Sequence, residues 1–509
     1  MLQQLRYMYE AGGWVLRESA LADLPSDLRW LYESGVVSID QLATIASHGL
    51  TSTADLDDAA AHHDLQQLPG LTSEVEHAIV QTLPTLSTAL RPISLGRAVA
   101  VADPVLQALQ ADRSIRSTTL AGSVRRGLDM VDAIEVVAPA TDPSSAFDSV
   151  QQMPDVSRTL HRSARRLYVL IDRVQVGIRC PAPESAGAAL LHLTGSIAHF
   201  ERLRQLAASR GLRLDVRGLR TPSDQVIGDA EEAVYAGLDL PWIPPEIRDG
   251  KREIDLAMSG TLPALVTRAD IKGDLHMHTD WSDGRDSVSD MAHAAAALGY
   301  RYIAITDHSP RSATRSLTAD NIKRQAEDIA AIRERLPQLT ILHGCEVDIL
   351  PSGRLDFSDR ILEGFDVVLA SLHEHAGHGP SQLMQRYRDA MRHPLVSVIT
   401  HPTNRQLPQR AAYELDYQRL FELAVETGTA VEVDGAPTHL DMNGTLARIA
   451  VAAGATIVID SDCHRTEMLG RQMDMGVQLA RNGWVEARHV LNTRDIDEVR
   501  ARIHAKRGR

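Results

Sequence analysis

The sequence predicts a multidomain α/β protein with three parts: a helical N-terminal domain, an α+β middle domain and a C-terminal parallel βα barrel. Its 509 residues correspond to about three domains of roughly 150 residues each. Apolar residues recur at helical spacing over 1–95, whereas β-like runs mix with helices over 96–250. Seven strand-like runs alternate with helical stretches over 272–509, which leaves 251–271 as a linker after a proline-rich boundary.

The composition is that of an ordinary folded protein, with 44% hydrophobic and 24% charged residues. We expect no membrane partner, because no apolar run reaches the roughly 18 residues of a spanning helix. We expect a cytoplasmic location, because the N-terminus lacks a signal-peptide pattern and three cysteines are too few for a disulfide framework. The net charge of −14 argues against a protein that simply coats nucleic acid, although it leaves room for a local basic groove.

The N-terminal part is predicted to form short helices. Apolar residues at helical spacing occur in DLRWLYESG (27–35), SIDQLATIASHG (38–49) and SEVEHAIVQTL (73–83). The sequence LPGLT at 68–72 predicts a turn between two of these helices, because Gly70 can take positive φ.

The middle part is predicted to combine strands with helices. The β-like runs are TTLAGS (118–123), AIEVVAP (133–139), RLYVLID (166–172) and VQVGIRC (174–180). The segment HFERLRQLAASRG is predicted as a helix that ends on Gly211.

The C-terminal part is predicted to form a parallel barrel. Its strand-like runs are IKGDLHMH (271–278), RYIAITDH (301–308), TILHGCE (340–346), DVVLASLH (366–373), VSVITH (396–401), AVEVDG (430–435) and TIVIDSDCH (456–464). In βα barrels the active site lies at the C-terminal ends of the strands. Almost every run ends in a histidine or an acid, and the strand-end residues are His276, His278, Asp307, His308, Glu346, His373, His401, Asp434, Asp462 and His464.

These strand ends predict a metal site. Imidazole and carboxylate are ligands for Zn²⁺, Mn²⁺ or Fe²⁺. Residues two apart in a strand share a face, so His276 and His278 aim two imidazoles the same way, and Asp283 in the following loop can fold over them. The set is too large for one zinc, which usually takes four ligands, and suits two or three divalent ions sharing a carboxylate. Such clusters clamp phosphate and generate hydroxide at neutral pH.

Several other histidines are expected to be ordinary core or surface residues, because a single histidine is more often hydrogen-bonded than metal-bound. These are His293, His343, His393 and His439, with His375 and His378 only slightly better candidates.

The motifs DLHMHTDWSDG, ITDHS, GCEVDI, ASLHEH, THPTNR and DSDCH resemble the motif series of the PHP (polymerase and histidinol phosphatase) domain. The resemblance implies a distorted (βα)₇ barrel that binds three metals. It implies nine ligands: His276, His278, Asp283, His308, Glu346, His373, His401, Asp462 and His464. It also makes Glu346 a catalytic residue that bridges metals, and Arg405 a catalytic residue near the substrate phosphate, where a planar guanidinium suits bidentate contact.

The rest of the chain resembles family X DNA polymerases. LAGSVRRG at 120–127 is similar to their nucleotide-binding turn, and LTGSIAHFERLRQLAASRGL at 193–212 to their TGS segment and following helix. The segment LQQLPGLTSEVEHAI resembles a degenerate helix-hairpin-helix motif. The whole chain is therefore similar to bacterial PolX-type proteins, and the resemblance implies DNA as a partner. Its implied remnant contacts to DNA or nucleotide are Gly122, Ser123, Arg125, Arg126, Gly195 and Ser196.

The polymerase-like part departs from the family at its carboxylates. The family patterns GDIDLLV and VDLR correspond here to DAIEVVA and VQVGIR, so three aspartate positions become Ala133, Glu135 and Gly177. A polymerase palm needs carboxylates on adjacent strands to hold two metal ions. Asp132 and Asp172 are poor substitutes, because a shift of one residue along a strand turns a side chain to the opposite face, and Asp172 lies well before the key position of its strand. We expect polymerase activity to be lost.

The N-terminal domain is also degenerate. Residues 1–250 contain no lysine, so the amine nucleophile of a deoxyribose-phosphate lyase is missing. Thr72 stands where the hairpin would carry its second glycine, and we expect weakened DNA binding there.

The sequence thus predicts a metal-dependent phosphoesterase. The family resemblance implies that it acts on DNA 3′ ends in DNA repair, as a 3′-5′ exonuclease, a 3′-phosphatase or an abasic-site endonuclease. One alternative is a small-molecule phosphatase of the histidinol-phosphate or nucleotide type, which the acidic net charge favours. The other is a noncatalytic DNA-binding scaffold.

Overall fold

The computed structural model describes residues 31, 36–48, 50, 55–56, 59–60, 62–89, 92–171, 174–223, 225–311, 315–373, 378–407 and 410–508. The chain divides into two compact units. The first comprises 1–92 with 157–162 and 167–170, and the second comprises 93–156, 163–166 and 171–509. The second unit therefore contains both most of the middle part and the whole C-terminal part of the chain.

The described N-terminal residues are helical, as the sequence predicts. The elements are α3 (Ile39–Ser47), the 3₁₀ helix η1 (Leu65–Gln67) and α5 (Ser73–Ala89). Ser38 begins α3 with a capping box, in which its side chain accepts from the backbone N–H of Gln41. Gly70 has a φ of 80° in the turn before α5, which is the backbone conformation that glycine accepts without strain. Most of the expected helix at 27–35 lies outside the described residues.

The middle part is built on a sheet of strand order β2-β4-β7-β6-β5. Its strands are β2 (Thr119–Leu120), β4 (Ile134–Val137), β5 (Val156–Ser163), β6 (Arg166–Ile171) and β7 (Val174–Arg179), with β1 (Ile93–Ser94) and β3 (Met130–Val131) paired separately. Its helices are α6 (Leu95–Ala111), α7 (Gly122–Arg125), α8 (Ser144–Gln151), α9 (Ala186–Thr194) and α10 (Ile197–Ser209). Every β-like run predicted for this part contains a strand.

A smaller sheet follows, of order β10-β9-β8, and packs with α9 to α12 around a separate core. The elements are β8 (Arg213–Asp215), β9 (Gly218–Arg220), β10 (Val226–Ile227), α11 (Glu231–Ala236) and α12 (Glu253–Met258). Leu203, Tyr235 and Ile247 are fully buried in this core.

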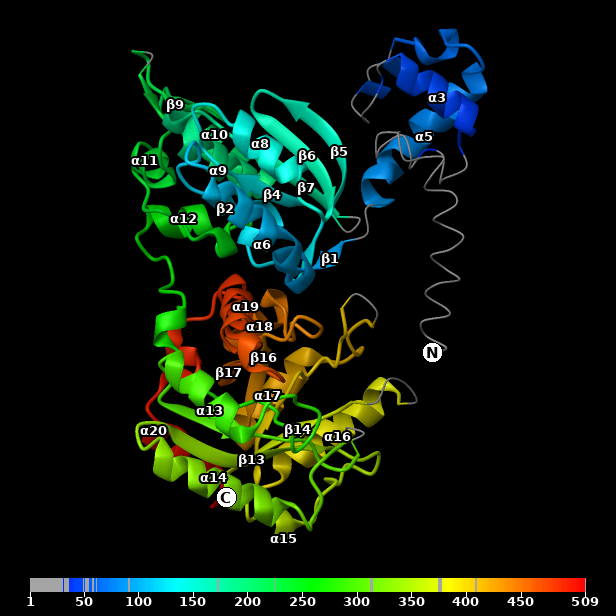
Figure 1. Cartoon of the computed structure of the whole chain (residues 1–509). Coiled ribbons are helices and arrows are strands. Elements are labelled where there is room, and N and C mark those ends of the chain that lie inside the picture. Colours follow the sequence, from blue (N-terminus) through cyan, green and yellow to red (C-terminus); the bar gives the residue numbers. More distant parts are fainter. Residues whose placement is uncertain are drawn as a thin grey trace. The chain divides into compact units, whose positions relative to one another are not determined.

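The C-terminal part is a seven-stranded parallel sheet of order β11 to β17, drawn from green to red in Figure 1. The strands are β11 (Gly273–Asp274), β12 (Tyr302–Ile305), β13 (Thr340–Asp348), β14 (Val367–Ser371), β15 (Val396–Ile399), β16 (Ala430–Asp434) and β17 (Ile457–Asp460). The helices are α13 (Val288–Ala297), α14 (Ile322–Arg335), α15 (Asp359–Leu362), α16 (Pro380–Arg392), α17 (Tyr417–Thr427), α18 (Gly444–Ala453), α19 (Leu469–Asn482) and α20 (Ile496–Arg507). Nearly all residues of these strands are buried, and most are apolar, as is usual for strands covered on both faces, but buried acids such as Asp274, Glu346 and Glu432 lie among them.

The barrel closes between its first and last strands by an unusual seam. A single parallel bridge joins Met277 to Cys463. Buried carboxylates supply further closure, since Oδ1 of Asp460 accepts the backbone N–H of Leu275 at 2.7 Å and Oδ1 of Asp274 accepts that of Ser461 at 3.2 Å. The fold is thus a distorted (βα)₇ barrel attached to a mixed α/β region, and this confirms the predicted fold class.

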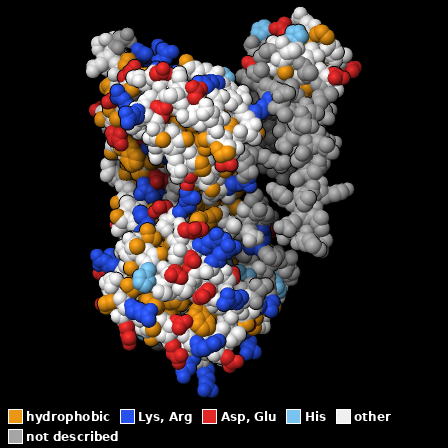
Figure 2. All heavy atoms as spheres, viewed as in Figure 1, with side chains coloured by type: hydrophobic (Ala, Val, Ile, Leu, Met, Phe, Trp, Pro, Cys, Tyr) orange, Lys and Arg blue, Asp and Glu red, His pale blue; other side chains and the backbone are white. Residues whose placement is uncertain are grey.

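Two further observations bear on the predicted partners. Within the described part of the chain, no helix is both long and apolar enough to cross a bilayer. On the face that Figure 2 shows, Lys and Arg side chains are interspersed with Asp and Glu side chains.

Candidate metal centre

The structure brings the nine residues marked by the PHP resemblance together at one end of the barrel. Apart from Asp283, each lies at or near the C-terminal end of a strand, and parallel strands bring those ends to one edge. Asp283 comes from the loop between β11 and α13 and meets the others there. The cluster comprises His276, His278, Asp283, His308, Glu346, His373, His401, Asp462 and His464.

Glu346 is the centre of this cluster and is fully buried. Its Oε1 lies 2.9 Å from Nε2 of His401 and 3.4 Å from Nε2 of His373. Its Oε2 lies 2.8 Å from Nδ1 of His308 and 3.5 Å from Nε2 of His276. A carboxylate with imidazoles on both oxygens is suited to bridge two cations, because each oxygen can serve a different ion.

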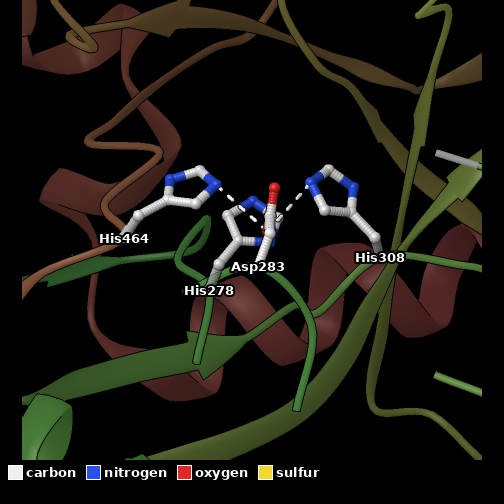
Figure 3. Close-up of side chains that lie close together, drawn as sticks. All are labelled: His278, Asp283, His308 and His464. Atoms are coloured by element: carbon white, nitrogen blue, oxygen red, sulfur yellow. Dashed lines mark ion pairs between the residues drawn. The ribbon is translucent and has the colours of Figure 1, made fainter. Parts of the chain in front are cut away.

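Two other carboxylates complete the cluster. The ligand atoms of His278, Asp283, His308 and His464 all lie within 4.8 Å of one another. In Figure 3 His308 and His464 flank Asp283, whose Oδ1 is 3.5 Å and 3.3 Å from their Nε2 atoms. Oδ1 of Asp462 lies 3.0 Å from Nε2 of His278. The candidate ligands therefore form adjoining groups with shared members, as expected of a site for more than one ion.

The donor atoms fit a divalent metal. Nε2 of His276 and Nε2 of His278 face each other at 3.1 Å, close to the roughly 3.3 Å that two imidazoles on one tetrahedral zinc have when each Zn–N bond is about 2.0 Å. Inside the cluster, Oε2 of Glu346 and Nδ1 of His308 lie 2.8 Å apart, and both are buried without a hydrogen bond among the described residues. Buried polar atoms without partners are costly unless a ligand or ion satisfies them.

The backbone of the site is also unusual. His401 has a φ of 24° and Asp462 a φ of 49°, although neither is glycine. Such conformations cost of order 1–3 kcal/mol and cluster at functional sites. Both residues lie two positions past the ends of their strands.

The charges of neighbouring side chains and burial together shift the pKa values of the clustered residues. Burial would raise the pKa of Glu346, but His308, His373 and His276 hold it well below the usual range. Burial would lower the pKa of His373, but the charge of Glu346 raises it to about 10. The pKa of His278 instead falls to about 3, because it is buried beside His308 and His464.

Three buried acids that the ligand prediction did not include orient the cluster from behind. Oε1 of Glu432 on β16 lies 2.6 Å from Nδ1 of His276, and its Oε2 accepts the backbone N–H of His401 at 2.7 Å. Oδ1 of Asp348 lies 3.1 Å from Nδ1 of His373. A carboxylate behind a ligand histidine fixes the tautomer and orientation of its ring.

The third of these acids is Asp307, which the sequence places at a strand end. It accepts hydrogen bonds from the side chains of Thr279 (2.6 Å), Ser282 (2.5 Å) and Gln325 (2.6 Å). Asp307 thereby holds the loop that carries Asp283. Glu432 lies two residues before Asp434 and Asp348 two residues after Glu346, so each shares a strand face with an acid of the predicted site, but this spacing alone does not identify an orienting role.

The histidines expected to be ordinary divide into two kinds. Two of them make polar contacts to residues outside the cluster. Nδ1 of His293 on α13 lies 2.7 Å from the carbonyl oxygen of Ser289, and Nε2 of His343 lies 2.9 Å from Oε1 of Gln325. His439, by contrast, stacks on His401 with ring centroids 5.1 Å apart. His375 lies outside the described residues.

Arg405 lies just beyond His401 but does not point into open solvent. Its side chain is 7% exposed and its Nη1 donates to Asp129, a residue of the middle part. Its Nε donates to the carbonyl of His439 at 3.0 Å. Nη2 is buried without a hydrogen-bond partner among the described residues.

The three positions that carry aspartate in the polymerase family lie close together in the polymerase-like sheet. On parallel strands β4 and β7, Glu135 is paired in register with Gly177, and Ala133 precedes Glu135 by two residues. Glu135 is 3.2 Å from Nε of Arg179, which lies two residues beyond Gly177 on the same strand. The single remaining carboxylate is therefore already paired with an arginine. The alternative Asp172 lies outside the described residues.

The predicted remnant contacts are largely engaged within the protein. Arg125 binds the buried Glu231 through both terminal nitrogens, at 2.7 Å and 2.8 Å, and Arg126 donates to the carbonyl of Thr194. Gly122 and Gly195 both have positive φ, Ser123 is 8% exposed, and Ser196 caps α10. The Arg125 charge is thus neutralised inside the fold, which the sequence alone did not indicate.

Comparison with known families identifies two parts of the chain. Residues 189–249 match the DNA polymerase beta thumb, and residues 274–436 match the PHP domain. The fold and site thus define a protein that joins a polymerase-type module to a PHP barrel.

Comparison with individual proteins covers nearly the whole chain. The chain is 34% identical over 459 residues to the DNA polymerase/3'-5' exonuclease PolX of Bacillus subtilis, covering 89% of this chain and 80% of that protein. The chain belongs to the PolX family. Its PHP part alone is also 31% identical over 217 residues to a probable phosphatase of Syntrophotalea carbinolica, covering 41% of this chain and 83% of that protein. The PHP part is likewise 30% identical over 250 residues to a probable phosphatase of Caldanaerobacter subterraneus, covering 46% of this chain and 92% of that protein.

Proposed function

We propose that the chain is a metal-dependent phosphoesterase that acts on DNA 3′ ends in repair and has lost polymerase activity. The observation that carries the proposal is the cluster around Glu346, in which carboxylates and imidazoles converge from strands spread over the whole barrel. The reaction class is 3′-5′ exonuclease, 3′-phosphatase or abasic-site endonuclease. The proposal includes domain boundaries near residues 95, 250 and 271, and a cytoplasmic location.

The residues of the site have separate tasks. The nine clustered side chains would hold two or three ions of Mn, Zn or Fe, and such ions polarise a phosphate and lower the pKa of a water molecule. Glu346 joins the groups of ligands to one another, while Glu432 and Asp348 fix the rings of His276 and His373. Arg405 offsets charge on the phosphoryl oxygens through its guanidinium.

The loss of polymerase activity rests on the middle sheet. Ala133 and Gly177 carry no carboxylate, and the remaining Glu135 is paired with Arg179. A two-metal polymerase site needs carboxylates on both adjacent strands. The similarity to the Bacillus subtilis protein supports work on DNA.

A small-molecule phosphatase is the second candidate. Its support is that the PHP part alone resembles proteins described as probable phosphatases, each matched over most of its own length. A DNA enzyme should prefer oligonucleotide 3′ ends over a simple phosphomonoester, and its DNA activity should fall with salt as bound counterions are released.

The test compares the intact protein with the variant H276A/H278A on a 3′-recessed duplex and on p-nitrophenyl phosphate, with metal content measured on the same samples. We expect the double variant to lose metal and both activities, and the control H293A, an exposed change on α13, to keep them. A higher kcat/KM on the ester than on DNA would favour the second candidate. Full activity in a verified metal-free sample would refute the proposal, and metal binding without hydrolysis of either substrate would favour a noncatalytic scaffold.

A further inference from the structure

The polymerase-like turn is packed tightly against the barrel. Nε2 of Gln478 on α19 donates to the carbonyl of Val124 at 2.8 Å, and Nδ2 of Asn482 donates to the carbonyl of Arg126 at 3.1 Å. A Cβ at Gly127 would lie 2.6 Å from the Gln478 side chain. The turn that binds nucleotide in polymerases thus presents its carbonyls to the helix that follows the last ligand strand.

A second contact extends this interface to the loop after β16. A Cβ at Gly96, at the start of α6, would lie 2.4 Å from the side chain of Pro437. The loop that contains Pro437 also contains His439, whose ring stacks on His401 of the metal centre and whose carbonyl accepts from Nε of Arg405. The middle part therefore contacts the rim of the metal centre through residues close in space to Arg405.

Asp129 is the residue of the middle part that contacts Arg405 directly. Its side chain is 22% exposed, and Oδ2 accepts from Nη1 of Arg405. Asp129 and the His439 carbonyl together engage two of the three guanidinium nitrogens. Because a guanidinium is planar, two fixed N–H directions set the orientation of the whole group. The remaining buried nitrogen, Nη2, is the one without a partner among the described residues.

We propose that Asp129 is a positioning residue of the phosphoesterase site, which holds Arg405 with Nη2 directed to the substrate phosphate. This rests on the proposed function. The polymerase-like part then contributes to the metal centre although two of its own three carboxylate positions, Ala133 and Gly177, carry no carboxylate. A side chain that delivers one charge-assisted hydrogen bond to a phosphate does so best when its plane is fixed beforehand, because misplacement by about 1 Å can cost two orders of magnitude in rate.

The test uses full-length D129N, in which the charge is removed and the shape is kept. We expect kcat/KM on the 3′-recessed duplex to fall about 10-fold or more and inhibition by inorganic phosphate to weaken, with metal content unchanged. D129E should recover part of the activity. The matched control is D132N, which changes an exposed carboxylate three residues away and should behave like the intact protein.

A double-mutant cycle separates positioning from a general effect on folding. In an R405A background, D129N should add no further loss of activity or of phosphate inhibition, because its partner is absent. Additive losses, or a D129N variant indistinguishable from the intact protein, would overturn the inference. A rise in activity would also overturn it, because Asp129 would then compete with the substrate phosphate. If the intact protein hydrolyses neither substrate, the proposed function itself fails and the cycle is not needed to decide that.

Discussion

Replacing Glu432 by glutamine should weaken metal binding without unfolding the barrel. Glu432 is fully buried and uses both carboxylate oxygens, one at 2.6 Å from Nδ1 of His276 and one accepting the backbone N–H of His401 at 2.7 Å. Glutamine keeps one oxygen and replaces the other with an amide that can only donate. One of the two neighbours then loses its acceptor.

The substitution should have two separate effects, one on the stability of the fold and one on metal affinity. A buried donor left unsatisfied costs about 1–3 kcal/mol. Loss of an outer partner of a ligand histidine costs about 10–100-fold in metal affinity, which corresponds to about 1.4–2.7 kcal/mol. We therefore expect the dissociation constant for Mn²⁺ to rise by about one to two orders of magnitude, and the unsatisfied donor to lower the free energy of unfolding separately.

The measurement is a metal titration with a competing chelator, performed on the intact protein, E432Q and the control E334Q, which alters an exposed carboxylate on α14. Hydrolysis at saturating metal should recover most of its rate in E432Q, because the ligands themselves remain. If E432Q binds metal within twofold of the intact protein while His276 still contributes to affinity, the orienting role of Glu432 is wrong.

Two further predictions concern the middle part. Primer extension should be absent with any divalent metal, because Ala133 and Gly177 lack carboxylates, and template-dependent incorporation by the unaltered chain would contradict this. Burial alone would raise the pKa of Glu231, but hydrogen bonds and charges from Arg125 and Arg248 lower it to about 2. Its contribution to stability, at most about 3 kcal/mol, is therefore present above about pH 4.5 and is lost as the pH falls towards 2. Urea midpoints at pH 7, 5 and 3 should converge between the intact protein and E231Q as the pH falls, whereas a constant gap would show that Glu231 acts by shape alone.

The barrel and its clustered residues could be predicted from the sequence for a simple reason. Parallel strands carry their C-terminal ends to one edge, so a histidine or acid after each strand predicts convergence even for His276 and His464, which lie far apart in the chain. Glu432 was not predicted as part of the site, because within a buried strand its spacing does not distinguish an orienting acid from any other polar core residue.

The contacts of the arginines could not be predicted at all. The sequence suggests that Arg125 can contact DNA, but its side chain is hydrogen-bonded to Glu231. Arg405 is hydrogen-bonded to Asp129, which lies 276 residues away in the chain. Such pairs depend on how separate folded regions meet. A one-dimensional pattern records charge and spacing within a segment but not which surface the segment later faces.

The narrow seam of the barrel has a consequence for its unfolding. Only Met277 and Cys463 form a bridge there in the described residues, whereas the other strand neighbours share ladders of two or more pairs. His278 and His464 come from the two sides of this seam, and an ion held by both would tie the first strand to the last. Such an ion would cross-link two strands that are separated by nearly the whole sequence of the barrel. The longer the loop that a cross-link closes, the more the cross-link lowers the conformational entropy of the unfolded chain. Removal of the ions should therefore make the backbone amides of β11 and β17 exchange with solvent first, well before those of the middle strands.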